Sequence, residues 1–131
     1  MNLTRSCSTE PVTQTEVSLN VYIGTTFKIT VTFYQDDGTT PLDLTLNEVE
    51  FNIVNCENEE IISINSSTTT ANGSTIVFVD AINGIAEITI TDEETLTFSK
   101  MKGYWWMTLN LPSGDKLLRG RGNIFIKNPY E

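Results

Sequence analysis

Residues 17–33 read VSLNVYIGTTFKITVTF, and their apolar side chains fall on every second position. The alternation covers residues 17–23, breaks at Gly24-Thr25-Thr26, and resumes over residues 27–33. A period of two places alternate side chains on opposite faces of an extended strand. These residues therefore predict two strands, each with one buried face.

Beyond these two strands, six further segments show the same alternation or are apolar throughout. They cover residues 49–53, 61–64, 76–79, 86–90, 104–111 and 116–127. Turn residues separate them, namely Asp36-Asp37-Gly38, Asn83-Gly84 and Pro112-Ser113-Gly114-Asp115. Thr91 and Glu94 fit a capping box, which predicts a short helix over residues 92–98. Segment 76–79 is apolar on both faces, so it is either central in the fold or covered on its outer side by another molecule.

Composition agrees with this pattern. The chain has twenty threonines, thirteen isoleucines and eight valines, but only three alanines. Side chains branched at Cβ favour strands over helices. Eight short strands in 131 residues predict an all-β fold, an antiparallel immunoglobulin-like β-sandwich of seven to nine strands. We expect an N-terminal arm at 1–16, the sandwich at 17–127 and a C-terminal tail at 128–131, with the arm either adding a strand to a neighbour or disordered.

Charge and residue usage exclude several functions. Eight basic and seventeen acidic residues give a net charge of −9, which disfavours nucleic acid as a partner. The absence of histidine removes Ser-His-Asp and Cys-His catalysis and histidine-ligated metals. The acidic groups at 57–60 and 92–94 lie in a loop and at a helix start, so they indicate neither a calcium site nor a glycosidase. We expect no enzyme activity, no cofactor and no metal.

Two cysteines, Cys7 and Cys56, either stay free or form one bridge, and their polar surroundings favour free thiols. The first residues lack the apolar run of a signal peptide, and no segment is long and apolar enough to cross a bilayer. We therefore expect no membrane association.

The last two predicted strands allow a candidate site to be placed. If residues 112–115 form a four-residue loop, Trp106 faces Arg121 and Thr108 faces Arg119 on the outer side of the sheet. On the inner side, glycines at 120 and 122 leave room for Met107 and Trp105. A tryptophan beside arginines suits cation–π stacking and protein contacts. The alternative is a solvent-facing stack that only shields the sheet.

Several stretches resemble small Ig-like modules of tailed-bacteriophage virions, such as the N-terminal domain of baseplate upper proteins and tail-fibre-associated modules. They are TVTFYQDDG (30–38), PLDLT (41–45), VEF (49–51), NGIAEITITDEET (83–95), and residues 103–115 and 117–120. The resemblance spans about residues 17–127. It implies a non-enzymatic structural protein of the virion, made in the host cytoplasm, whose partners are other virion proteins and copies of itself.

The resemblance leaves the place in the particle open. The chain has no room for a following fibre or receptor-binding domain, so tail, baseplate, neck, fibre-attachment and capsid decoration (cement) roles all fit. A function of another class is a carbohydrate-binding module, in which Trp106 and Tyr34 stack on sugars. The candidate partner-binding residues are therefore Trp106, Arg119, Arg121 and Tyr34.

Overall fold

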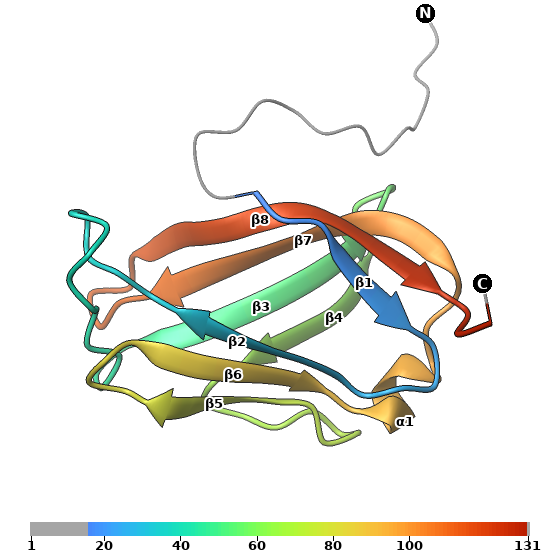
Figure 1. Cartoon of the computed structure of the whole chain (residues 1–131), viewed down its shortest axis with the longest axis horizontal. Helices are drawn as coiled ribbons and strands as arrows, with labels where there is room; N and C mark the ends of the chain where they lie inside the picture. The colour runs from blue at the N-terminus through green and yellow to red at the C-terminus, as the bar shows by residue number, and fades with distance from the viewer. Residues whose placement is uncertain (1–15, 131) are drawn as a thin grey trace, which may run out of the picture.

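The computed structural model describes residues 16–130 of the chain (Figure 1). The elements are β1 (Leu19–Tyr22), β2 (Phe27–Thr32), β3 (Glu48–Asn55), β4 (Glu60–Asn65), β5 (Thr75–Asp80), β6 (Ile85–Ile90), α1 (Asp92–Thr95), β7 (Met101–Asn110) and β8 (Lys116–Lys127). All eight predicted strands are confirmed, most with ends shifted by a few residues. No helix in this part of the chain is long and apolar enough to cross a membrane.

The strands form two sheets packed face to face. One has the order β1-β8-β7-β3-β4 and the other the order β2-β6-β5. Neighbouring strands run antiparallel except β1 and β8, which are parallel. The second, fifth and sixth strands thus share one sheet, while the third, seventh and eighth share the other, with the fourth strand beside the third. This distribution is that of an immunoglobulin-like sandwich, so the predicted fold is confirmed.

The core lies between the inner faces of the two sheets. Phe51 of β3 and Trp105 of β7 stack there with ring centroids 5.7 Å apart. Around this pair lie fully buried aliphatic side chains from both sheets, among them Val21, Ile53, Ile88, Ile90 and Ile124. The alternation seen in the sequence is what supplies these inward positions, because every second side chain of a strand faces the same layer.

Close backbone approach explains the glycine at position 122. A Cβ there would lie 2.0 Å from the carbonyl oxygen of Val17, which comes from the segment before β1. The amide of Val17 bonds to the carbonyl oxygen of Arg121 at 3.1 Å, and the indole Nε1 of Trp105 donates to the carbonyl oxygen of Val17 at 2.8 Å. At Gly120 a Cβ would lie 3.1 Å from the Trp105 ring. The prediction that these glycines leave room for large side chains is confirmed, and Gly122 also admits the neighbouring chain segment.

The predicted pairing of β7 with β8 is confirmed from Met101 to Met107, but it is wrong between Met107 and the loop. Leu111 and Asp115 close a three-residue loop in which Gly114 has φ +96°. The loop is one residue shorter than predicted, so Thr108 faces Leu118 and not Arg119. A bulge then leaves Arg119 as the extra residue and restores the predicted pairing.

The helix cap is half confirmed. The side chain of Thr91 accepts a hydrogen bond from the amide of Glu94 at 3.2 Å, as predicted. The helix ends at Thr95, three residues before the predicted end. The amide of Thr91 donates to Ser74 and not to Glu94, whose carboxylate instead accepts bonds from the β4–β5 loop. The reciprocal half of the predicted capping box is therefore wrong, because a tertiary contact takes the Glu94 side chain.

Strand β5 lies at the edge of the three-stranded sheet. Its outward side chains Val77 and Val79 are 53% and 61% exposed. A central position for this doubly apolar segment is thus wrong. The other possibility, a cover provided by another molecule, stays a prediction.

Candidate functional site

Trp106 and Arg121 lie directly opposite each other on β7 and β8, as predicted. Both are half-buried on the outer face of the five-stranded sheet, where the structure has a pocket of about 220 Å³. The residues lining it include Glu16, Tyr104, Trp106, Leu118, Arg121 and Asn123. Counting Trp105, the pocket is thus lined by three aromatic residues, one aliphatic residue, one arginine, one asparagine and the acidic Glu16, a set suited to a protein side chain.

The backbone around Arg121 is held from both sides. Trp106 of β7 pairs with it on one flank, and Glu16 forms a parallel bridge with it on the other. Glu16 therefore belongs to the sheet, although the sequence placed it in the arm. A site on paired strands is more rigid than one on a loop, so little conformational entropy is lost when a partner binds.

The predicted set of four residues separates into two groups. Because of the bulge, Arg119 turns away, and its Nη2 lies 4.0 Å from Oδ1 of Asp36 while its Nε is buried without a hydrogen-bond partner. Tyr34 lies after β2 in a bridge with Pro41, and it does not line the pocket. Trp106 and Arg121 are therefore brought together, while Arg119 and Tyr34 are not. For Arg119 the reason is the bulge, which could not be read from alternation.

Arg121 does not stack on Trp106, although their pairing would permit that contact. Among the described residues, the cation–π contacts are made by Lys102 and Lys127, whose Nζ atoms lie 5.7 Å and 5.8 Å from the ring centroid of Phe125. Lys102 faces Phe125 across the hairpin, and Lys127 lies two residues further along β8. This cluster was not predicted from the sequence, although the predicted register of the hairpin already pairs Lys102 with Phe125.

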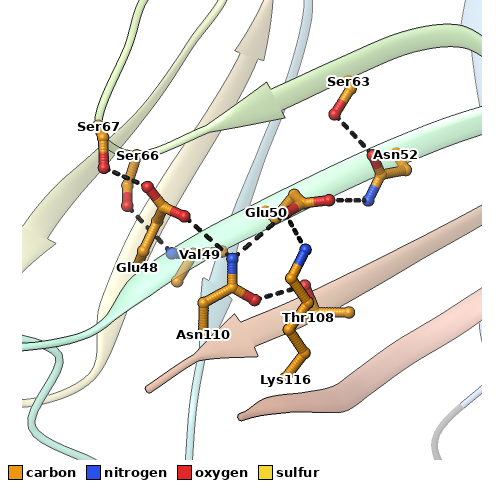
Figure 2. Close-up of polar contacts among 10 residues, drawn as sticks. All are labelled: Glu48, Val49, Glu50, Asn52, Ser63, Ser66, Ser67, Thr108, Asn110 and Lys116. Carbon is orange, nitrogen blue, oxygen red and sulfur yellow. Dashed lines mark hydrogen bonds and ion pairs between the residues drawn. The ribbon is translucent and has the colours of Figure 1, made fainter. Parts of the chain in front are cut away.

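A chain of polar contacts covers the other half of the same outer face (Figure 2). Glu50 of β3 is at its centre and accepts hydrogen bonds from Asn52 at 3.0 Å, Asn110 at 3.2 Å and Lys116 at 3.3 Å. Burial alone would raise the pKa of Glu50, but these bonds outweigh it and lower the pKa below its ordinary value. The carboxylate is therefore held charged by donors from three strands.

The network continues to the edge of the sheet. Asn52, only 5% exposed, accepts a bond from Ser63 of β4 at 2.7 Å. Asn110 also donates to Glu48 at 3.0 Å, and Glu48 accepts a bond from Ser67. Both polar atoms of the buried Asn52 side chain are thus satisfied. Polar side chains whose hydrogen bonds are all made within the protein help to fix the strand register. They have few free donors or acceptors for a partner, so the half of the face around Trp106 is the better contact surface.

Charge is unevenly divided along the chain. The β7–β8 hairpin, Met101 to Lys127, carries five basic residues and one acidic residue, and the rest of the chain carries three and sixteen. The hairpin that holds Trp106 and Arg121 is therefore the basic part of an acidic protein. A positively charged surface attracts an acidic partner and raises the rate at which the two associate.

The acidic clusters do not form a metal site within residues 16–130, where no three acidic or cysteine side chains converge on one point. Asp37 instead closes its own turn. Bonds from the side chain and amide of Thr40, with one from the amide of Thr39, lower the pKa of Asp37 to about 2. Asp37 thus stabilises its own turn.

Cys56 is disulfide-bonded, so the expectation of free thiols is wrong for this residue. Its Sγ lies 3.0 Å from the carbonyl oxygen of Lys102, beside the start of β7. The other cysteine of the sequence, Cys7, lies outside the described residues, as do most of the predicted arm and the last residue of the predicted tail.

Comparisons with known proteins give a structural match. No protein-family model and no curated protein matches the chain. Among solved structures, a chain of the crystal structure of the ZIG-8–RIG-5 IG1–IG1 heterodimer is similar, with 10% sequence identity and a TM-score of 0.44. The match covers 92% of this chain and 89% of that chain. It is the strand order of the two sheets that makes the fold immunoglobulin-like.

Proposed function

We propose that this protein is a non-enzymatic structural component of a tailed-phage virion, and that it acts by protein–protein contacts. The observation that carries the proposal is the pairing of Trp106 with Arg121 over a pocket of about 220 Å³. Tryptophan and arginine are the residue types most enriched where interfaces gain their energy. The phage setting is supported by the sequence motifs described above, from TVTFYQDDG to LLRG.

The partner surface is expected to be acidic with at least one aromatic or aliphatic side chain. Arg121 supplies a positive charge beside apolar side chains, the hairpin around it is basic, and Glu16 is the one acidic residue that lines the pocket. A carboxylate of the partner would pair with the guanidinium, while an apolar neighbour would enter between Trp106 and Leu118. Other virion proteins and further copies of this chain are the proposed partners.

Two alternatives share the same surface. A capsid decoration protein would use the contact on the capsid shell, so only its location in the particle differs. In a carbohydrate-binding module Trp106 and Tyr34 would act together, but Tyr34 does not line the pocket at Trp106. That separation favours a protein partner.

Quantitative mass spectrometry of purified particles tests the proposal. Particles are produced with the wild-type gene or with Trp106→Ala, Arg121→Glu or Arg119→Glu, each checked for folding by circular dichroism. Arg119→Glu is the matched control, since Arg119 lies off the pocket. We expect Trp106→Ala and Arg121→Glu to lower incorporation about tenfold or more, which corresponds to a binding loss of about 1.4 kcal/mol or more. Absence of the wild-type chain from particles refutes the virion role, and normal incorporation of Arg121→Glu refutes the surface.

A further inference from the structure

A second surface lies at the end of the sandwich where the β3–β4 turn meets the segment after α1. The structure has a groove there of about 590 Å³. Its apolar side chains are Ile61, Phe98 and Met101, and two exposed acids, Glu57 and Glu60, also line it. Cys56, the disulfide-bonded cysteine, is part of the same groove.

We propose that this groove binds the N-terminal segment of the same chain, and that a disulfide between Cys56 and Cys7 fixes it there. The sequence contains two cysteines, so Cys7 is the one other cysteine of this chain that Cys56 can bond. The proposal concerns a different surface from the pocket at Trp106 and does not depend on the proposed function.

The length of the segment permits this bond. The described chain starts at Glu16, which pairs with Arg121 on β8, and Cys56 contacts Lys102, which pairs with Phe125. Four residues along β8 span about 13 Å, and two strand spacings add about 10 Å sideways, so Cys56 is roughly 20 Å from Glu16. The nine residue steps from Cys7 to Glu16 reach about 30 Å when extended.

Tethering also favours this bond over one between two molecules. A linker of this length holds its end at an effective concentration of the order of millimolar. Separate copies at micromolar concentration meet far less often. When a disulfide oxidant such as oxidised glutathione takes the two electrons and two protons of the two thiols and is itself reduced to thiols, an intrachain bond is therefore the expected product.

The residues next to Cys7 match the groove. Leu3, Arg5 and Cys7 are spaced by two, so in an extended segment all three side chains point to the same side. With Cys7 at Cys56, Arg5 comes within reach of Glu57 and Glu60. Leu3 then follows toward the apolar side chains of the groove. Arg5 is the one basic residue before Lys28, and of the three charged residues that line the groove two are acidic, Glu57 and Glu60, and one is basic, Lys102.

Peptide mapping of the full-length chain without reduction tests the bond. We expect one linked peptide containing Cys7 and Cys56, and a monomer on a non-reducing gel. A Cys56–Cys56 dimer, or alkylation of both cysteines without reduction, overturns the proposal. Dithiothreitol should convert the bond into two thiols, with two electrons and two protons supplied as the reagent closes to its cyclic disulfide.

Trypsin cleavage after Arg5 tests the groove separately from the bond. In the oxidised chain we expect cleavage at least roughly tenfold slower than in Cys7→Ser, because a docked segment is cut only when it opens. The double variant Glu57→Gln/Glu60→Gln keeps the disulfide and should lose part of that protection. Equal rates in the oxidised chain and in Cys7→Ser overturn the docking, and unchanged protection in the double variant overturns the contact with Arg5. Circular dichroism shows that each variant is folded.

Discussion

Replacing Gly122 with alanine tests how the segment before β1 is attached to the sheet. The new Cβ would lie 2.0 Å from the carbonyl oxygen of Val17, an overlap that only displacement of the Val17 backbone can relieve. Two hydrogen bonds are lost with that displacement. One joins the amide of Val17 to the carbonyl oxygen of Arg121, and the other joins the indole of Trp105 to the carbonyl oxygen of Val17.

The magnitude follows from these two bonds. Loss of the backbone bond costs about 1 kcal/mol, and a buried indole without an acceptor costs about 1–3 kcal/mol. Alanine in place of glycine in a strand returns about 0.5–1 kcal/mol. We therefore expect Gly122→Ala to lower the free energy of unfolding by about 2 kcal/mol.

Urea unfolding followed by tryptophan fluorescence measures this change. Gly38→Ala is the control, because Gly38 has a positive φ of 76° but no atom lies within 4 Å of the place that its Cβ would take. In a Trp105→Phe background, where the indole donor is already gone, the effect of Gly122→Ala should shrink to about 1 kcal/mol or less. A loss below about 0.5 kcal/mol in the wild-type background, or an equal loss in both backgrounds, would contradict this explanation.

Two further predictions concern other positions. Gly84→Ala should lower the free energy of unfolding by at least about 2 kcal/mol more than Gly38→Ala does, as measured by urea unfolding. The reason is that a Cβ at position 84 would lie 2.6 Å from the carbonyl oxygen of Phe33. Equal losses for the two variants would contradict this explanation. The carboxyl group of Asp37 should titrate with a pKa of about 2, so its contribution to stability is complete above pH 3.8 and is lost as the pH falls toward 2. Carboxyl chemical shifts measure this pKa, and Thr40→Val should raise it; a pKa near 3.8 in the wild-type protein would count against the turn bonds.

The polar network around Glu50 and the pocket at Trp106 divide one face of the sheet between two roles. On the Glu50 side, donors from β3, β7 and β8 already occupy the carboxylate, so that side has little left to offer a partner. On the Trp106 side, an aromatic ring, an arginine and a leucine line a pocket. This contrast makes the hairpin end the more suitable place for a contact.

Local sequence patterns were enough to predict the strands, the positions of the turns and the pairing of Trp106 with Arg121. Alternation and turn residues act between neighbours in the chain, and the pair lies in a hairpin whose two strands are joined by a short loop. The spacing of Gly120 and Gly122 opposite Met107 and Trp105 was readable for the same reason.

Long-range packing, in contrast, set which strands became edges, where the bulge fell and what the glycines and acids contact. Arg119 does not line the pocket, because the hairpin loop is one residue shorter than predicted and a bulge at Arg119 compensates for it. Strand β5 is an edge strand, because it pairs with β6 and with no other strand of its sheet. Glu94 turned to Thr70 and Cys56 came beside Lys102 through contacts across 24 and 46 residues. Such contacts leave no local pattern in the sequence, because they depend on how distant segments pack after the strands have formed.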